Sequence, residues 1–272
     1  MFIGFSSFII AVALAILGSL TFWPIQHGYD FYIPIVLFLA GFIGMILFWW
    51  CFIYFAGLII NSKKDHKKVN KFARFLLTDA MRFIDNHAGA IVKINGRDKL
   101  PKGERYLFVQ NHQSRFDPMI INGYFPKEDI AFITKPSNYK IPLAKNLMPA
   151  LFYQAIDRED PIQSLGVIKN SAELIANGVT SIGVYPEGTR HKDGELGEFH
   201  EGVFNICLKA KCPLVICVTK NIIDIPKHFP FLPTRVVVDI IDVMTYEQME
   251  GKTAKALSDE VHDMMLKHIK GN

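Results

Sequence analysis

The first 60 residues constrain the fold of this chain more than any other feature, because they contain no lysine and no arginine. Asp30 is the only acidic residue among them, whereas all 30 basic residues of the chain lie after Asn61. Two apolar runs fill this part, residues 1–23 and residues 31–60. About 20 apolar residues suffice to cross the hydrocarbon core of a bilayer. We therefore predict a hairpin of two membrane helices over residues 1–60.

Two other interpretations of this apolar segment stay open. A secretory signal peptide would need a basic region before its apolar core, and residues 1–23 have none. A hairpin that enters one leaflet and returns is compatible with the short connection between the runs. Residues 61–74 carry six basic residues against one acid, and the positive-inside rule puts such a cluster in the cytoplasm. We expect an integral membrane protein with its remaining residues on the cytoplasmic side.

The net charge of +4 is mild, and many of the basic residues gather just after the apolar segment. Such a cluster attracts anionic lipid headgroups, by about 1 kcal/mol per basic residue near the surface. Nucleic acid binding would need basic residues interleaved with exposed aromatic side chains over a longer face. We therefore expect a lipid bilayer as a partner and no nucleic acid.

Three cysteines, Cys207, Cys212 and Cys217, are spaced five residues apart, as in some metal sites. Cys207 falls in a predicted helix and Cys217 in an apolar strand, where free cysteine behaves as a small buried hydrophobe. A cytosolic domain also disfavours disulfides. We expect neither a metal nor a cofactor.

Residues 61–89 are predicted to form a basic amphipathic helix. Its apolar residues recur near helical spacing: Phe72, Leu76, Phe83 and Ile84. Lysine and arginine residues surround them. Such a helix suits the membrane interface, and packing of its apolar face against the following domain explains the pattern equally well.

The rest of the chain alternates between strand and helix patterns. The expected strands are residues 90–96, 105–110, 130–135, 152–157, 181–185, 213–219 and 234–241. The clearest helix starts with Asp160 as N-cap and Pro161 in its first turn, and it ends at Asn177-Gly178. Further helices are expected over residues 201–211 and 253–270. The alternation predicts an α/β fold over residues 90–272, a single layered domain with a mixed, mostly parallel sheet flanked by helices.

The strand expected at residues 105–110 runs into His112, and Asp117-Pro118 follows as the expected start of a helix. Within one helix, a five-residue step would turn the two side chains about 140° apart, but across a strand-to-helix turn they can meet. A carboxylate that holds a histidine in one tautomer makes it a general base. The alternative is that Asp117 only caps its helix. No nucleophile motif accompanies the pair, so the base is expected to act on a substrate hydroxyl.

A second polar turn follows the strand expected at residues 181–185, with the sequence PEGTR. Gly188 lets backbone amides approach a ligand, Thr189 adds a hydroxyl, and Arg190 offers a planar fork that fits a phosphate. By itself, this stretch is also compatible with an ordinary turn that carries exposed charges.

Taken together, NHQSRFD and YPEGTR resemble the 1-acylglycerol-3-phosphate acyltransferase family. The N-H-x-x-x-x-D block of the family matches at Asn111, His112 and Asp117, and its F-P-E-G-T-R block matches from Pro186 to Arg190. FITKPSNYKIPL and AIDRED resemble its second block, and KCPLVICVT its fourth. The resemblance covers about residues 90–220. One departure is a tyrosine, residue 185, where phenylalanine is common.

The resemblance implies transfer of an acyl group from a thioester, acyl-CoA or acyl carrier protein, to the sn-2 hydroxyl of 1-acylglycerol-3-phosphate. His112 would take the hydroxyl proton, and Asp117 would hold the ring and favour the imidazolium. The oxyanion donors are expected among the backbone amides after His112. The acyl chain would need an apolar groove beside the pair.

The resemblance also implies a binding site for the phosphate of the acceptor. Its expected members are Gly188, Thr189 and Arg190, with Lys135 and Arg158 as further candidates. Glu187 would orient the acceptor or a neighbouring arginine.

Other functions stay open. The chain is also compatible with an acyltransferase for another lysophospholipid or a lyso-aminolipid, or with a membrane protein that only binds lipid. A metal-dependent hydrolase would use His112, Asp117 and Glu187 as ligands. Ser114 is an alternative covalent acyl carrier, although it lacks the glycine-framed elbow of serine nucleophiles.

Overall fold

The computed structural model describes residues 2–21, 28–61, 66–157 and 159–271. The chain divides into two compact units, Met1–Lys63 (unit 1) and Lys64–Asn272 (unit 2). Arg158 lies outside the described residues, as do parts of the expected interhelical turn and of the basic cluster.

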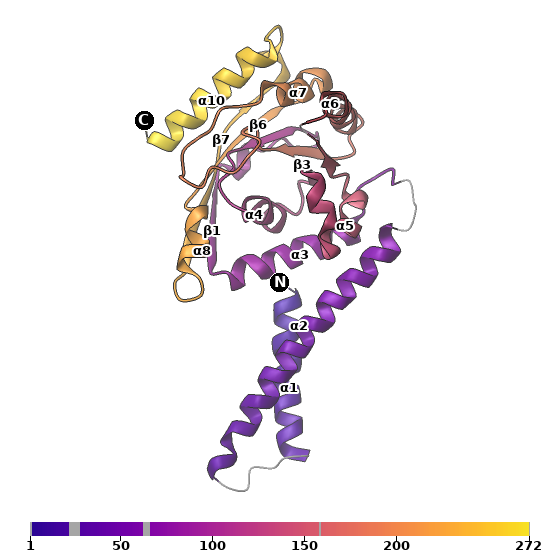
Figure 1. Cartoon of the computed structure of the whole chain (residues 1–272), viewed down its shortest axis with the longest axis vertical. Coiled ribbons are helices and arrows are strands. Elements are labelled where there is room, and N and C mark those ends of the chain that lie inside the picture. The colour runs from indigo at the N-terminus through magenta and orange to yellow at the C-terminus, as the bar shows by residue number, and fades with distance from the viewer. Residues whose placement is uncertain (1, 22–27, 62–65, 158, 272) are drawn as a thin grey trace. The chain divides into compact units, whose positions relative to one another are not determined.

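Unit 1 consists of two apolar helices, α1 (Phe2–Thr21) and α2 (Tyr32–Asn61), which pack against each other (Figure 1). Small residues allow the close approach, because a Cβ at Gly41 would lie 3.3 Å from the Cα of Ala11. Trp49 Nε1 also donates a hydrogen bond to Ser6 Oγ at 3.1 Å. Both helices are long and apolar enough to cross a bilayer. The predicted helical pair is confirmed, and it suggests that the chain associates with a membrane.

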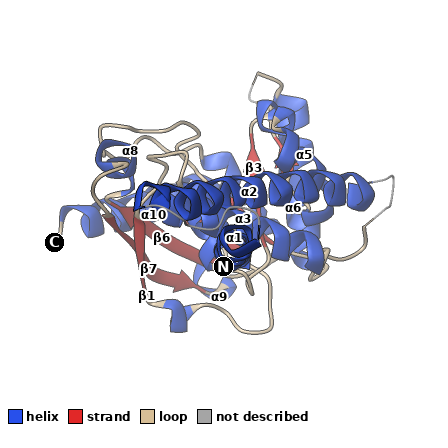
Figure 2. Ribbon diagram, turned by 90° about the horizontal axis from the view of Figure 1, so that it is seen from below, coloured by secondary structure: helices blue, strands red, loops and turns tan. Residues whose placement is uncertain are grey.

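Unit 2 is built on a seven-stranded sheet with the order β1-β7-β6-β2-β5-β3-β4. The strands are β1 (Ala90–Asn95), β2 (Leu107–Gln110), β3 (Ile130–Thr134), β4 (Gln154–Ala155), β5 (Ser181–Val184), β6 (Leu214–Lys220) and β7 (Thr234–Met244). All neighbouring pairs are parallel except β6 with β7. Figure 2 shows β1, β7 and β6 side by side at one end of the sheet. The predicted mixed, mostly parallel sheet is confirmed.

Helices cover both faces of this sheet. They are α3 (Lys71–His87), α4 (Asp117–Tyr124), α5 (Pro142–Leu147), α6 (Pro161–Ala176), α7 (Asn205–Ala210), α8 (Ile225–His228), α9 (Tyr246–Met249) and α10 (Ala254–Lys270). In Figure 1, α3 and α4 lie below the sheet, and α6, α7 and α10 lie above it. The start of α6 is as predicted, because Asp160 Oδ1 accepts hydrogen bonds from the amides of Ile162 and Gln163.

The apolar face of α3 packs within unit 2, against α4 among other elements. Its buried side includes Leu76 and Phe83, whereas Phe72 is half exposed. Arg74 is buried too, and its guanidinium donates to Asn122 Oδ1 at 2.9 Å and to the carbonyl oxygen of Ile130 at 3.2 Å. This arrangement fits core packing, the second explanation of the helical pattern.

Asp85, near the end of α3, is fully buried, and neither of its carboxylate oxygens has a hydrogen-bond partner among the described residues. It faces Gly123 of α4, where a Cβ would lie 3.3 Å from Asp85 Oδ2. Burial without a partner raises the pKa of Asp85 to about 8. The side chain therefore keeps its proton near neutral pH in the folded protein.

This carboxyl should make the stability of unit 2 dependent on pH. Between its unfolded pKa of about 3.9 and a folded pKa near 8, the folded state binds more protons than the unfolded state, so stability falls as pH rises, by up to about 1.4 kcal/mol per pH unit. Asp85→Asn removes the titration. Its apparent melting temperature should exceed that of the parent at about pH 8 and approach it below about pH 3, where the acid is protonated in both states. The exposed Asp98, changed to Asn, is the control, and an equal gain at both pH values would contradict the assignment.

Candidate active site

The sheet topology brings the predicted site residues to one edge. Strands β2 to β6 run parallel, so their carboxyl ends meet at the same edge, which we call the carboxyl edge. His112 follows β2, Glu187 and Arg190 follow β5, and Lys135 follows β3. Ligands bind at such edges in open α/β sheets.

His112 and Asp117 meet at the turn between β2 and α4. Asp117 Oδ2 lies 2.8 Å from His112 Nδ1, and the Asp117 side chain is fully buried whereas that of His112 is 18% exposed. When Nδ1 carries the proton and donates it to Asp117, the lone pair of Nε2 is free. No described residue hydrogen-bonds Nε2. The pair thus has the geometry of an oriented general base.

The Asp117 carboxylate also organises the turn that carries His112. Its Oδ2 accepts hydrogen bonds from the amides of Gln113 at 2.8 Å and Ser114 at 2.7 Å. Asp117 is the first residue of α4, not its N-cap, and no side chain caps this helix. The carboxylate therefore points towards the residues that precede it in the turn. The alternative that Asp117 only caps its helix is wrong.

Glu187 holds the same turn from the side of β5. Its Oε1 accepts the amide of His112 at 2.6 Å, and its Oε2 accepts the amide of Gly197 at 2.9 Å. The amide of His191 donates to the carbonyl oxygen of His112 at 2.8 Å. Burial raises the pKa of Glu187 to about 7, against the opposing effect of these amides and of His191. With no exposed side-chain surface, Glu187 contacts the backbone of His112, which differs from the expected contact with the acceptor.

Carboxylates occupy most amides of the expected oxyanion site. The amides of His112, Gln113 and Ser114 all donate to carboxylates. They are therefore not free to stabilise a developing oxyanion, and the amide of Phe116 donates to Ser114 Oγ, which narrows the expected donors of this turn to the amide of Arg115. The sequence does not reveal that two buried carboxylates fold back onto this turn.

Tyr185 stacks on the ring of His112. The two ring centroids are 4.1 Å apart with planes 19° from parallel, and Phe132 stacks on the far side of Tyr185 at 5.3 Å. The tyrosine hydroxyl is buried without a hydrogen-bond partner in the described structure. Burial, and then the nearby Asp117 carboxylate, raise the pKa of Tyr185 well above its usual value. A neutral aromatic face therefore supports the imidazole.

Asn111 links the turn to β6. Its side chain donates to the carbonyl oxygen of Thr219 at 3.0 Å and accepts the amide of Thr219 at 2.8 Å. Both residues are buried. The amide side chain thus continues the pairing of β2 with β6 beyond the end of β2, and the asparagine before His112 is structural.

The predicted phosphate-binding residues differ in exposure. Thr189, Arg190 and Lys135 are exposed at the carboxyl edge, whereas Gly188 is buried. Gly188 has a φ of 70° and donates its amide to the carbonyl oxygen of Tyr185 at 3.0 Å. It therefore closes the turn from which Thr189 and Arg190 project.

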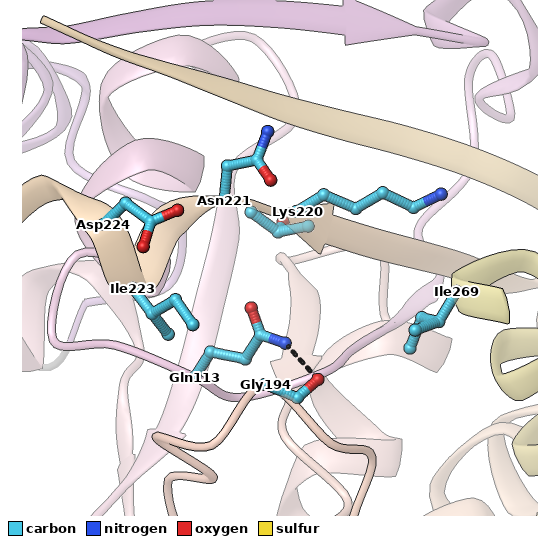
Figure 3. Close-up of a pocket in the computed structure, with 8 residues that line it drawn as sticks. Gln113, Gly194, Lys220, Asn221, Ile223, Asp224 and Ile269 are labelled. Atoms are coloured by element: carbon cyan, nitrogen blue, oxygen red, sulfur yellow. Dashed lines mark hydrogen bonds between the residues drawn. The ribbon is translucent and has the colours of Figure 1, made fainter.

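A pocket of about 240 Å³ lies on the β6 side of residues 111–116, the turn between β2 and α4 that we call the catalytic turn (Figure 3). Gln113 Nε2 donates to the carbonyl oxygen of Gly194 across it at 3.1 Å. Its lining residues are mostly polar: Gln113, Gly194, Thr219, Lys220, Asn221, Ile223, Asp224 and Ile269. Such a lining does not suit an acyl chain, so this pocket is not the expected apolar groove.

The predicted burial of Cys207 and Cys217 is confirmed, and Cys212 is a buried free thiol as well. Burial raises the pKa of the Cys207 and Cys212 thiols to about 12. In the described parts of the chain, no group of three His, Cys, Asp or Glu side chains is arranged to hold a metal ion. The hydrolase alternative would also need Asp117 and Glu187 as ligands, yet backbone amides occupy Asp117 Oδ2 and both Glu187 oxygens.

Sequence reasoning missed three contributors to this site. Tyr185 was noted only as a departure from phenylalanine, and nothing in the sequence signals its stacking on His112. His191 was likewise noted only as a departure, because a small hydroxyl residue usually follows the arginine of this block in the family, and Gly197 was not singled out. A Cβ at Gly197 would overlap the His191 ring, so the glycine is the signal for this close approach.

Comparisons with known proteins find similarity to acyltransferases. A protein-family model described as Acyltransferase matches residues 91–220. A chloroplastic 1-acyl-sn-glycerol-3-phosphate acyltransferase of Brassica napus is 33% identical over 123 residues, which cover 45% of this chain and 35% of the relative. The 1-acyl-sn-glycerol-3-phosphate acyltransferase of Saccharomyces cerevisiae is 25% identical over 186 residues, which cover 67% of this chain and 61% of the relative. The chain thus spans about a third to three fifths of the length of these relatives.

The fold also matches a solved structure. The crystal structure of the 1-acyl-sn-glycerophosphate (LPA) acyltransferase PlsC from Thermotoga maritima superposes with a TM-score of 0.59 and 22% identity, and the match covers 83% of this chain and 95% of that one. At this identity, the match supports the fold alone. The family match confirms the resemblance that the sequence motifs indicated.

Proposed function

Because residues 91–220 belong to the Acyltransferase family, we propose that this chain transfers an acyl group from a thioester to the sn-2 hydroxyl of 1-acylglycerol-3-phosphate. The observation that carries the proposal is the 2.8 Å contact between His112 Nδ1 and Asp117 Oδ2. It leaves Nε2 as an oriented base at the edge where Arg190 and Lys135 are exposed.

In the proposed mechanism, His112 Nε2 takes the proton of the acceptor hydroxyl while its oxygen attacks the thioester carbon. Asp117 stabilises the imidazolium that forms, and a well-placed base of this kind contributes about 10²–10⁴ in rate. The tetrahedral intermediate then expels the thiolate, which receives the proton from His112. Ser114 is not needed as an acyl carrier, and its buried Oγ accepts the amide of Phe116 at 3.3 Å.

The acceptor phosphate is proposed to bind the exposed cations at the carboxyl edge. Arg190 follows β5 and Lys135 follows β3, its parallel neighbour. Thr189 adds a hydroxyl beside Arg190, and Arg158 stays a candidate from the sequence. Glu187 is proposed to act indirectly, by positioning the backbone of His112.

Unit 1 is proposed to anchor the protein as an integral membrane hairpin. The basic cluster that follows it supports a cytoplasmic location for unit 2, by the positive-inside rule. Acyl-CoA and acyl carrier protein thioesters would both be available on that side.

A panel of acceptors tests the proposal. Purified protein should convert lysophosphatidate into phosphatidate faster than it acylates lysophosphatidylcholine or lysophosphatidylglycerol, with acyl-CoA or acyl carrier protein as donor, and in excess chelator. Preference for another acceptor would indicate the alternative, a remodelling acyltransferase. Transfer that is lost in chelator and restored by zinc or manganese would contradict the proposed mechanism, and no transfer to any lysolipid would leave only lipid binding.

Arg190→Lys tests the phosphate site. Lysine keeps the charge but loses the paired donors of the guanidinium, so the KM for lysophosphatidate should rise by roughly tenfold or more, as expected for a charge-assisted hydrogen bond worth about 1.5–3 kcal/mol. The KM for the thioester, measured in the same variant, should change little. An effect confined to the thioester would assign Arg190 to the donor instead.

Glu187→Gln separates positioning from acceptor binding. The side-chain amide of glutamine would place an N–H donor against the backbone N–H of His112 or Gly197, and two donors repel each other. The turn should therefore shift. We expect kcat to fall by up to about 10²-fold for a displacement near 1 Å. The KM for lysophosphatidate should stay nearly constant. Glu195→Gln, at an exposed position of the same loop, is the matched control. A raised KM with normal kcat would support the contact with the acceptor expected from the sequence.

Tyr185→Leu tests the stacked ring. Loss of an aromatic face beside the imidazolium should lower kcat by about 2- to 30-fold, which corresponds to 0.5–2 kcal/mol. Tyr185→Phe keeps the ring and should restore kcat. If Phe fails to restore it, the buried hydroxyl is the active group.

A further inference from the structure

Exposed apolar side chains of unit 2 gather at the carboxyl edge. In the described part of this unit, the large exposed apolar residues outside α3 lie after β3, after β4, after α8 and at the start of β1. The exposed fractions at the main positions are 90% for Phe231, 84% for Ile162, 63% for Leu165 and for Leu232, 55% for Phe229 and 49% for Ile141. The segment before β7 meets this edge because β7 is antiparallel to β6.

The most exposed of these residues lie on a well-braced turn. Residues 229–232, which we call the apolar tip, connect α8 to β7 and form a protruding turn in Figure 1. The amides of Phe231 and Leu232 donate to the carbonyl oxygen of His228 at 3.0 and 2.9 Å. Prolines at positions 226, 230 and 233 restrict the backbone further. The apolar tip therefore loses little conformational entropy when it becomes buried against another surface.

The exposed positions flank the catalytic turn. The tip lies beside β7, and Ile162 begins α6 just after β4, so five strand spacings of about 4.8 Å, roughly 24 Å, separate the two ends of the edge. His112 lies between them, after β2. A flat surface that contacts both ends would therefore cover the catalytic turn.

The chemistry of this edge fits a bilayer better than a protein partner. Its apolar side chains form two groups about 24 Å apart instead of one patch, whereas a stable protein interface buries about 800 Å² on each side around a contiguous core. The exposed lysines Lys140 and Lys145 follow β3 and complement anionic headgroups, whereas the exposed Lys227 pairs with Asp224 at 2.8 Å. The two apolar helices of unit 1 already suggest that the chain associates with a membrane.

We propose that the carboxyl edge of unit 2 is a second, interfacial membrane contact, with the apolar tip and the start of α6 inserted at its two ends. The catalytic turn then faces the lipid surface directly. This inference rests on the exposed side chains and the sheet topology, so it stands even if the acceptor is a different lysolipid.

Tryptophan scanning of the full-length protein tests the contact. Phe231→Trp and Ile162→Trp are reconstituted separately in vesicles of phosphatidylcholine with a minority of phosphatidylglycerol, with and without brominated acyl chains. The parent emission is subtracted, because three tryptophans are native. Bromine near the glycerol end of the chains should quench most of the added emission at both positions, and bromine near the terminal methyl much less, since interfacial residues lie about 5–10 Å into the headgroup boundary.

Lys102→Trp is the matched control, because this exposed residue precedes β2 at the opposite edge. Its emission should be quenched by aqueous iodide and not by bromine. The proposal is overturned if either test position behaves like this control. Emission that is shielded from iodide but not quenched by bromine would reveal a protein contact and would overturn it as well.

Discussion

Neighbouring strands of a parallel sheet end at the same edge, and the pairing of β2 with β5 and β6 therefore decides where each candidate group of this protein lies. His112 follows β2, and Arg190 follows β5. Without this pairing, His112 and Arg190 would remain 78 residues apart along the chain (190 − 112) with no reason to meet. Asn111 reinforces it, because its side chain extends the bonding between β2 and β6 past the end of the strand.

Buried carboxyl groups have two different roles in unit 2. Asp117 and Glu187 accept backbone amides of the catalytic turn, and together they fix the backbone from which the His112 ring projects. Backbone donors offset part of the desolvation of such a carboxylate, although burial still raises the pKa of Glu187 to about 7. Asp85 has no such donors, and burial raises its pKa to about 8. The same residue type is thus an organiser in one place and a proton-holding group in the other.

The proposed reaction requires that the surface around the site contact the membrane, in addition to requiring a base in the site. A lysolipid keeps its acyl chain in the bilayer, so its headgroup must reach a base at the membrane surface. Exposed apolar side chains at both ends of the carboxyl edge would satisfy this demand, because insertion on two sides of His112 limits how far the turn can tilt away from the lipid. The stacked ring of Tyr185 and the carboxylate of Asp117 would meanwhile keep the imidazole in one orientation.

Local patterns determined much of this protein. Apolar run length predicted the two N-terminal helices, alternating patterns predicted the seven strands, and the Asp160 and Asn177-Gly178 signals marked α6, because these features depend on neighbours in sequence. The motif spacing also paired His112 with Asp117. Only the tertiary structure decided which atoms the buried carboxylates contact, that Tyr185 covers the imidazole, and that the amides of Gln113 and Ser114 are occupied. Asp117 reaches those two amides within its own turn. Glu187 and Tyr185 meet His112 from more than 70 residues away in the chain because their strands pack at one sheet edge, and no local periodicity encodes that register.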